Sequence, residues 1–407
     1  MLFYRLLLSA LTPVLITALL VRVLRGQEQL SDFSERLGLW RDVPKGPIFW
    51  AHGASNGELS GARPILEGIL SQRTDIRLFV TCNSTSAKAM VKAWQHPRVD
   101  VRLAPLDLRW LYLRILKTLD VERFILIEAD FWPNRLIAAQ GTGSALCLIG
   151  GRMSQRSGAG WSRFRGLAER VFATFDMISA QDSAAQNRLL ELGAHKDAFK
   201  ATLNLKSLFQ GTSTEDVDPN RHNFWLAAST HDTEDDTLLR AHIELRKTLP
   251  RIKMILAPRH PKRADDIERL AKNLELNVAR RSTGAALSKD CDVYLADTLG
   301  EMDKWYRAAA ICFVAGSLAP KGGHTPFEPA YYNCAILHGP HLENFQSSYD
   351  TLAAEAAAWQ CSTPKEIAEA VIALQNNELA VKQCQNAQRA LAKASNFDSV
   401  LEALLET

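Results

Sequence analysis

The sequence predicts an α/β protein of two Rossmann-like domains, preceded by a hydrophobic N-terminal helix. Two series of short apolar runs alternate with helical patterns, which is typical of parallel sheets with helices on both faces. A polar, turn-rich stretch at 210–220 separates the two series and is interpreted as a linker. Ligands of open α/β sheets bind beyond the carboxyl ends of the strands, so two facing sheets predict a cleft between the domains.

The N-terminal segment carries no charge from residue 6 to residue 21, and arginines flank it on both sides. With the first residues included, it approaches the ~20 apolar residues that span a bilayer, and Pro13 is expected to kink it. A cleaved signal peptide and a buried helix are the alternatives, but no small-x-small cleavage site follows. We expect residues 1–25 to form an uncleaved anchor or an interfacial helix, with the basic flank on the anionic cytoplasmic leaflet.

The composition is that of a globular protein. Hydrophobic residues fill 47% of the 407 positions, enough for buried cores, and the length suggests two or three domains. The net charge of +3 gives no sign of bulk nucleic-acid binding. The seven cysteines form no CxxC pair and lie mostly in or beside apolar runs. We therefore expect reduced, buried thiols and a reducing compartment.

The first series of strands and helices defines an N-terminal domain over residues 26–209. Its strands are predicted at 48–51, 77–81, 99–103, 123–127, 145–149 and 177–180, and its helices at 60–72, 85–95, 107–118 and 183–192. A second domain is expected over 210–380, followed by a helix at 381–407 that packs back toward the N-terminal domain. The strands of the second domain are predicted at 224–228, 252–257, 293–296, 311–315 and 335–338, and its helices at 233–247, 262–273, 300–309, 343–357 and 364–375.

A glycine-rich loop after the apolar run 311–315 is the first candidate binding site. It reads GSLAPKGGHTPFEP from Gly316 to Pro329, and a helix is predicted to begin near Pro326. Such a loop exposes backbone N–H groups and the positive end of a helix dipole, which suits a phosphate. Glu328 would lie in the first helical turn, where it can accept from sugar hydroxyls. The alternative is that the glycines serve turn geometry only.

Two acids that follow strands of the first domain are candidates for catalysis. Glu58 ends the loop after strand 48–51, where a helix N-terminus is expected to make it ionise easily. An ionised acid above a cleft can act as a general base, and the alternative is a helix cap without a chemical role. Glu128 follows the fourth strand, and Trp132 and Pro133 are expected to form an apolar wall beside it. The alternative for Glu128 is structural pairing with a cation.

Three further strand ends in the second domain carry polar, cationic or glycine-bearing loops. Ser229-Thr230-His231 ends one strand, and Glu234 three residues later gives the pattern of a capping box, which is the alternative interpretation. Pro258-Arg259-His260 ends the next strand, and cations at such a position suit a nucleotide phosphate or a carboxylate. The segment 297–302 follows a third strand and opens a helix. Three consecutive strand ends that carry such loops are stronger evidence for a binding site than any one of the loops alone.

Motifs of metal and nucleophile catalysis are missing from the sequence. The ten histidines form no HExxH motif and no paired Cys/His spacing, and neither a G-x-S-x-G elbow nor a P-loop lysine motif occurs. We therefore expect no metal site and no bound cofactor.

The motifs occur in a fixed order along the chain. They are Ala54-Ser55-x-Gly57-Glu58, Glu128-x-x-x-Trp132-Pro133-Asn134, Arg152-x-Ser154-x-x-Ser157, Asn204-Leu205-Lys206, Ser229-Thr230-His231, Pro258-Arg259-His260, Asp297-Thr298-x-Gly300-Glu301-Met302, Gly316-Ser317 and Gly322-Gly323-His324-x-Pro326-x-Glu328-Pro329. This ordered set, with the hydrophobic N-terminus, resembles the 3-deoxy-D-manno-octulosonic acid (Kdo) transferases. The resemblance extends from the N-terminus to Asn344-Phe345, nearly the whole chain, and its specificity lies in the set rather than in any single motif.

The resemblance implies a membrane-associated GT-B glycosyltransferase that inverts the anomeric centre and needs no metal. The implied donor is CMP-Kdo, and the implied acceptor is a lipid A precursor on the cytoplasmic side of the cell inner membrane. By match to the family, Glu58 is the general base and Glu128 is a second acid in the cleft. The predicted acceptor-binding residues are Ser55, Asn56, Gly57 and Arg152. The predicted donor-binding residues are Lys206, Ser229, Thr230, His231, Pro258, Arg259, His260, Gly300, Glu301, Met302, Gly316, Ser317, Lys321, Gly322, Gly323, His324, Thr325 and Glu328.

The chain departs from the family pattern at four positions and so resembles a divergent branch. Thr325 replaces a family Asn in the GGHN motif, Gly150 replaces an Asn, Leu203 replaces a Gly, and Asn56 replaces a small apolar residue. Two alternatives stay open: a GT-B enzyme with another nucleotide sugar or lipid acceptor, and a catalytically inactive membrane-bound paralogue. The intact acids argue against the inactive paralogue.

Overall fold

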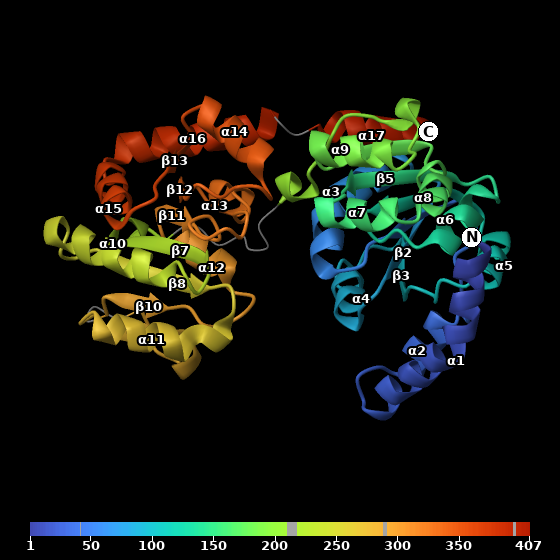
Figure 1. Ribbon diagram of the computed structural model, residues 1–407, viewed down its shortest axis with the longest axis horizontal. Coiled ribbons are helices and arrows are strands. Elements are labelled where there is room, and N and C mark those ends of the chain that lie inside the picture. Colours follow the sequence, from blue (N-terminus) through green and yellow to red (C-terminus); the bar gives the residue numbers. More distant parts are fainter. Residues whose placement is uncertain (41, 210–217, 288–290, 394–395) are drawn as a thin grey trace. The chain divides into compact units, whose positions relative to one another are not determined.

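The computed structural model describes residues 1–40, 42–209, 218–287, 291–393 and 396–407, which form two compact α/β units (Figure 1). The first unit contains Met1–Leu208 and the C-terminal helix, and the second contains the residues between them. Most of the predicted linker, 210–217, lies outside the described residues.

The first unit is built on a six-stranded parallel sheet with the order β3-β2-β1-β4-β5-β6. Ala51 in its centre pairs with Val80 of β2 and Ile125 of β4, so the carboxyl ends of β1 and β4 lie side by side. All six predicted strands are confirmed, because the central ones are apolar runs that helices cover on both faces. The strands are β1 (Ile48–His52), β2 (Arg77–Cys82), β3 (Val99–Leu103), β4 (Val121–Ile127), β5 (Ala145–Gly151) and β6 (Met177–Ala180).

Alternate side chains of these strands enter two separate cores. On β1, the Trp50 ring packs against Phe79 and Phe124 on one face, whereas Phe49 and Ala51 enter the core on the other face. Two short turns, η1 (Lys196–Ala198) and η2 (Leu205–Leu208), complete the unit. Its covering helices are α3 (Asn56–Gln72), α4 (Thr85–Lys92), α5 (Arg109–Thr118), α6 (Pro133–Gln140), α7 (Gln155–Ser162), α8 (Arg165–Phe172), α9 (Ser183–Glu191) and α17 (Phe397–Glu406).

Two of the departures from the family pattern are explained by packing at the end of β5. Gly150 has a φ of +59°, and a Cβ atom there would lie 2.6 Å from Cγ of Leu205. Leu203 is itself buried in the core that contains Leu205. The glycine therefore allows the segment before η2 to pack closely against the strand end, while Leu203 fills the core beneath it.

The second unit contains a seven-stranded parallel sheet with the order β13-β12-β11-β7-β8-β10-β9. All five predicted strands are confirmed, and two edge strands, β9 and β13, were not predicted. Each has only three residues, and most of them are partly exposed, so neither gives an apolar run in the sequence. The strands are β7 (Phe224–Thr230), β8 (Lys253–Pro258), β9 (Val278–Arg280), β10 (Val293–Leu295), β11 (Ile311–Val314), β12 (Ala335–His338) and β13 (Ala358–Gln360).

Helices cover both faces of this second sheet (Figure 1). The predicted helix at 381–407 is divided in the structure: α16 packs within the second unit, and α17 packs against α3 in the first. Short 3-10 turns are η3 (Arg221–Asn223), η4 (Pro261–Arg263) and η5 (Arg281–Thr283). The helices are α10 (Asp235–Thr248), α11 (Ala264–Asn273), α12 (Met302–Ala308), α13 (Phe327–Tyr331), α14 (Gln346–Ala354), α15 (Pro364–Ala373) and α16 (Asn377–Lys393).

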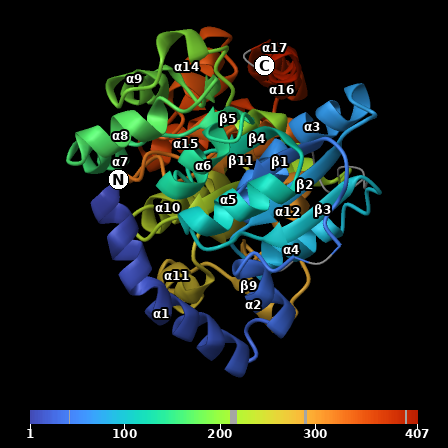
Figure 2. The same cartoon turned by 90° about the vertical axis from the view of Figure 1, so that its right-hand side faces the viewer.

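The predicted N-terminal helix is α1 (Leu2–Leu24), and α2 (Leu30–Arg36) lies beside its far end (Figure 2). With a mean hydropathy of 2.2 in its most apolar window, α1 is long and apolar enough to cross a membrane. Throughout α1, which the structure describes completely, Leu19 alone is buried, so this is not a core helix. Its first turn is fixed to the unit by a hydrogen bond that the Tyr4 hydroxyl donates to Asp107 (2.8 Å).

Candidate active site

Glu58 lies in the first turn of α3, directly after the carboxyl end of β1. Ser55 is the N-cap of this helix, and its side-chain oxygen accepts a hydrogen bond from the Glu58 N–H (3.4 Å). The Glu58 carboxylate accepts in turn from the Ala54 N–H (2.6 Å) and from the Ser55 hydroxyl (3.1 Å). These bonds hold the half-buried carboxylate in one orientation at the strand end.

The prediction that Glu58 ionises easily is wrong. Burial raises the pKa of Glu58 to about 7, and the negative charges of Glu128 and Asp130 add to this rise. The hydrogen bond from Ala54 lowers the pKa but does not offset these effects. A carboxylate with this pKa is a stronger base than a solvated one and is still ionised in part at neutral pH. Glu58 therefore has the properties that a general base requires.

Glu128 follows β4 in the left-handed backbone region, with a φ of 59°, which is uncommon outside glycine. Its N–H donates to the Ile149 carbonyl (3.0 Å), and its carbonyl accepts from the Arg152 N–H (3.0 Å). Burial raises the pKa of the Glu128 carboxyl, and the positive charges of Lys206 and Arg152 oppose this rise without cancelling it. The structure therefore brings Glu128 close to Glu58, and it brings Arg152 and Lys206, which we predicted for the acceptor and the donor, close to Glu128.

The buried His52 pairs with the half-buried Asp130 next to Glu58, and we did not predict a role for this pair. Nε2 of His52 is 2.8 Å from Oδ2 of Asp130, and Nδ1 is 2.9 Å from the Thr81 hydroxyl. Burial and the charge of Arg135 lower the pKa of His52 to about 4, so the ring is neutral near pH 7. Its single N–H therefore donates to Asp130, and its Nδ1 accepts from Thr81.

Asp130 keeps a negative charge close to Glu58. Burial alone would raise the pKa of Asp130, but the hydrogen bond from His52 and the charge of Arg135 hold it well below its usual range. The Trp132 indole N–H, from the tryptophan predicted to form a wall beside Glu128, donates to Asp130 (2.8 Å). The sequence did contain a signal for this pair, because His52 and Asp130 follow or end strands that are neighbours in the sheet.

The predicted acceptor-binding residues of this unit are accessible to a ligand. Ser55, Asn56 and Gly57 lie at least partly exposed at the start of α3, and Arg152 is exposed after β5. The Ser86 hydroxyl donates to the side-chain carbonyl of Asn56 (3.0 Å), which orients that amide at the rim.

Glu234 organises the glycine-rich loop of the second unit. Its side chain is fully buried before α10, between the loops that follow β7 and β11. The sequence pattern of a capping box accounts for only the bond from His231. The two carboxylate oxygens accept from five backbone N–H groups, those of His231 (2.9 Å), Gly316 (2.8 Å), Ser317 (3.0 Å), Leu318 (2.9 Å) and Ala319 (3.4 Å).

The prediction that this loop exposes its N–H groups to a phosphate is therefore wrong for much of the loop. The backbone N–H groups of residues 316–319 donate to Glu234. The N–H groups of Lys321 and Gly323 donate to carbonyls within the loop (2.7 Å each). The predicted helix start at Pro326 is confirmed, but α13 has only five residues and offers little dipole. An anion at this loop would have to be met by side chains.

The glycines of the loop are required by its backbone path. Gly316, Gly322 and Gly323 have φ angles of +71°, +83° and +74°. A Cβ atom on Gly322 would lie 2.5 Å from the side-chain amide of Asn344, which donates to the Lys321 carbonyl (2.8 Å). The Ser317 hydroxyl is buried and accepts from the Gly339 N–H (2.7 Å), so Ser317 has a structural role in the loop.

Cationic and imidazole side chains gather at the carboxyl ends of β7, β8 and β11. Nε2 of His231 is 3.0 Å from Nε2 of His324, so one ring must donate and the other accept. The rings of His231 and His260 lie 6.1 Å apart. Arg259 and Lys321 are exposed, and within the described part of the chain neither is paired with an acid. These groups are the ones available to hold a phosphate or a carboxylate.

The loops after β7 and β8 are joined by backbone bonds. The Arg259 N–H donates to the carbonyl of the buried Thr230 (3.0 Å), next to Pro258 at the end of β8. Ser229 adopts a φ of 61°, a second strained position at a predicted binding site. The Thr230 hydroxyl is buried and has no hydrogen-bond partner among the described residues.

The predicted site residues 300–302 form a separate loop after β10. The hydrogen bond from Arg281 lowers the pKa of Glu301 to about 2, and the Thr298 hydroxyl also donates to this carboxylate. Gly300 has a φ of +82°, and Met302 is half-buried at the start of α12. The loop at 300–302 and the three histidines, His231, His260 and His324, all follow strands of the same parallel sheet. They therefore lie at the same carboxyl-terminal edge of that sheet.

The last two predicted residues flank the start of α13. The Thr325 hydroxyl accepts from the Phe327 N–H (3.3 Å), so the residue that departs from the family pattern serves the helix start. Glu328 is half-buried, and its charge adds to burial in raising the pKa of Tyr306. Among the described residues, no group of three or more His, Cys, Asp or Glu is arranged to hold a metal ion.

The fold is that of GT-B glycosyltransferases. A glycosyltransferase from Rickettsia africae matches 89% of this chain and 98% of its own with a TM-score of 0.57 at 11% identity. Anabaena HepE, solved with UDP and glucose, matches 89% of this chain and 99% of its own with a TM-score of 0.54 at 13% identity. Likeness at this identity shows the fold, and it confirms the predicted fold class.

Sequence comparison identifies the family. Residues 31–208 match the family described as 3-deoxy-D-manno-octulosonic-acid transferase (kdotransferase). The chain is 30% identical to the Bordetella pertussis 3-deoxy-D-manno-octulosonic acid transferase over 378 residues, covering 87% of this chain and 86% of that one. It is 27% identical to the Haemophilus influenzae enzyme of that name over 399 residues, covering 95% and 93%. The chain therefore belongs to the Kdo transferase family, and it is a glycosyltransferase, as the motifs predicted.

Proposed function

We propose that this protein transfers Kdo from CMP-Kdo to a lipid A precursor with inversion, and that Glu58 is the general base. The observation that carries the proposal is Glu58 itself, a half-buried carboxylate with a pKa of about 7 that is fixed at the end of β1. Glu58 takes the proton from the acceptor hydroxyl as the hydroxyl oxygen attacks the anomeric carbon. The bond from that carbon to the CMP phosphate breaks, and CMP leaves with the electron pair.

The second unit is proposed to hold CMP-Kdo. Arg259, His260 and Lys321 offer positive charge or N–H donors at one edge of the sheet, which can stabilise the departing phosphate without a metal. Glu234 fixes the loop that carries Lys321, and backbone N–H dipoles point at its carboxylate, so it repels an anion less than a carboxylate without such donors would. The proposed location is the cytoplasmic side of the inner membrane, supported by the apolar, exposed α1.

The direct test is incubation of the full chain with CMP-Kdo generated in situ and a tetra-acylated lipid A precursor, followed by mass spectrometry. We expect the acceptor mass to rise by one or more Kdo units. Parallel reactions replace CMP-Kdo by UDP- and GDP-sugars, because another nucleotide sugar is the alternative donor. Transfer from one of those and none from CMP-Kdo would contradict the donor assignment.

The pH dependence of kcat/KM should report the ionisation of Glu58 in the free enzyme. Because the base must be ionised, kcat/KM is expected to rise about tenfold per pH unit below pH 7 and to level off above it. Glu128→Gln removes a negative charge that raises the pKa of Glu58, so this limb of the profile should move to lower pH. If the pH at which kcat/KM levels off is the same in Glu128→Gln as in the wild type, the titrating group is not Glu58.

Arg259→Ala is expected to raise KM for CMP-Kdo by about 10- to 100-fold, since a hydrogen bond to a charged group contributes about 1.5–3 kcal/mol. Arg259→Lys should recover part of this loss, because lysine keeps the charge but not the bidentate geometry. Lys262→Ala, a nearby exposed cation outside the proposed site, is the control and should change KM by less than about twofold. Initial rates at varied CMP-Kdo check both expectations.

A further inference from the structure

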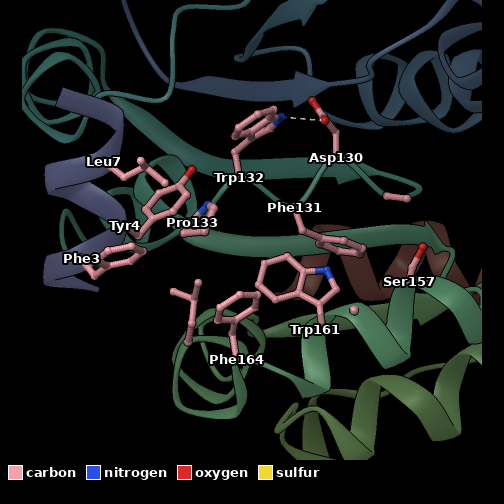
Figure 3. A pocket seen from close by; sticks show the side chains of 13 residues that line it. Phe3, Tyr4, Leu7, Asp130, Phe131, Trp132, Pro133, Ser157, Trp161 and Phe164 are labelled. Atoms are coloured by element: carbon pink, nitrogen blue, oxygen red, sulfur yellow. Dashed lines mark hydrogen bonds between the residues drawn. The ribbon is translucent and has the colours of Figure 1, made fainter. Parts of the chain in front are cut away.

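A largely apolar pocket of about 560 Å³ lies in the first unit against the N-terminal helix (Figure 3). Its walls come from three elements: Phe3 and Tyr4 of α1, Trp132 and Pro133 after β4, and Trp161 of α7 with Phe164 after it. The volume falls within the range of about 300–1,000 Å³ typical of small-molecule sites. The role proposed above for Glu58 does not use this pocket.

Several of the side chains around the pocket are large, apolar and exposed, which is unusual for a protein surface in water. The exposed fractions are 76% for Phe3, 64% for Phe164 and 45% for Trp132. Within the most apolar 18-residue stretch of α1, only 6% of the residues are buried, so the helix exposes apolar side chains along its length. A contiguous apolar face of this kind marks a site for a membrane or an apolar ligand.

A basic depression adjoins the pocket and shares two of its walls, Phe164 and Leu167. It is lined by Met1 and by three arginines, Arg163, Arg165 and Arg170. Glu169 pairs with Arg165 (2.9 Å), which leaves the other two arginines without an acidic partner among the described residues. An apolar hollow beside a cationic one matches an amphiphile that has an acyl chain next to an anionic phosphate.

The pocket is also linked to the proposed catalytic carboxylate. Asp130 contributes to its lining, and the charge of Asp130 helps to raise the pKa of Glu58. On the other side, Tyr4 donates to Asp107, which also accepts from the Asn134 N–H (3.0 Å). The start of α1 is therefore bound to the segment that follows β4, and the pocket lies between the helix and that segment.

We propose that this pocket holds one acyl chain of the phosphorylated lipid acceptor, with a headgroup phosphate in the basic depression. The proposal rests on the proposed function, because it assigns part of the acceptor of that reaction. A chain held between α1 and the segment after β4 fixes the sugar headgroup near Asp130 and Glu58. The acyl chain thus becomes a determinant of acceptor recognition, separate from attachment of the protein to the bilayer.

The kinetic test compares two double variants in detergent micelles, where attachment to a bilayer plays no part. Phe3→Ala with Phe164→Ala removes two exposed pocket walls and is expected to raise KM for the tetra-acylated acceptor at least about tenfold. KM for CMP-Kdo and for the de-acylated, phosphorylated acceptor should not change. Leu20→Ala with Leu24→Ala, exposed on α1 outside the pocket, is the matched control and should leave all three constants unchanged. Equal losses with both acceptors, or no loss with either, would overturn the proposal.

A binding measurement separates this proposal from the transferase function. A tetra-acylated acceptor with brominated chains should quench tryptophan fluorescence on contact, and Trp132→Phe with Trp161→Phe should remove most of that quenching. If the protein shows this quenching but transfers no Kdo, the acyl-chain site is supported and the proposed transferase function is contradicted. Transfer without such quenching, or equal quenching by brominated phosphatidylglycerol, would show that no acceptor-specific acyl site exists here.

Discussion

Glu58→Gln is expected to lower kcat for Kdo transfer by about 10²–10⁴-fold, the usual contribution of a general base. The amide cannot take the proton from the acceptor hydroxyl, although it can still accept the hydrogen bond from the Ala54 N–H. Affinity for CMP should stay within about twofold of the wild type, because Glu58 lies outside the unit that is proposed to hold the nucleotide. Single-turnover transfer and CMP binding by calorimetry measure the two quantities separately.

Glu67→Gln is the control for this experiment. Glu67 lies on the same helix, is exposed, and pairs only with Arg63 at 2.7 Å in the described structure. Exposed pairs of this kind contribute about 0.2–1 kcal/mol, so the control should retain full activity. If Glu58→Gln turned over at the wild-type rate, the assignment of the base would be wrong, whatever the donor and acceptor are.

Glu58→Gln should also stabilise the protein in a way that depends on pH. The pKa of Glu58 is about 7 in the folded protein, against about 4.5 for a solvated glutamate, so the folded state binds this proton more tightly. Ionisation of Glu58 therefore costs stability progressively from about pH 4.5 to pH 7 and fully above that. The variant should gain up to about 1–3 kcal/mol over the wild type at pH 8 and nothing at pH 4. Thermal unfolding at the two pH values measures the difference.

The fold was accessible from the sequence because both sheets are buried on their two faces. Strands such as 123–127 and 311–315 are continuous apolar runs, and this pattern defines their limits without any knowledge of their neighbours. The edge strands 278–280 and 358–360 lack that pattern, since three partly exposed residues give no periodic signal. Their pairing is created by the sheet and not by their own composition.

The candidate site was accessible only in part. Glu58 was found because it stands at the end of a predicted strand, but its raised pKa depends in part on Asp130, which is 72 positions later in the numbering and was given no role. The role of Glu234 depends on residues more than 80 positions away, so the local pattern suggested no more than a capping box. The positions of Glu58 and Glu234 near predicted strand ends thus drew attention to both residues. The pKa of Glu58 and the hydrogen-bond partners of Glu234 depend on contacts with distant segments, which the sequence pattern does not give.

Glu234→Ala is expected to have the largest effect on stability of any substitution at the site. It would leave the N–H groups of Gly316, Ser317 and Leu318 buried without an acceptor, and an unsatisfied buried donor costs about 1–3 kcal/mol. Even with partial relaxation of the loop, we expect a loss of at least about 3 kcal/mol. Calorimetric unfolding should show this as a fall of about 6–12 °C in the transition of the second unit.

Glu234→Gln tests the same carboxylate without removing its volume. Its amide offers one oxygen to the loop, but its NH₂ group faces N–H donors, so the loop after β11 should lose part of its order. Because that loop carries Lys321 and His324, we expect KM for CMP-Kdo to rise at least about tenfold, with the pH profile of Glu58 unchanged. Glu244→Gln on α10 is the control, since Glu244 is exposed and pairs with Lys247 (2.6 Å). Wild-type stability and KM in Glu234→Gln would mean that the loop holds its shape without the buried charge, and the donor site would then need another organising residue.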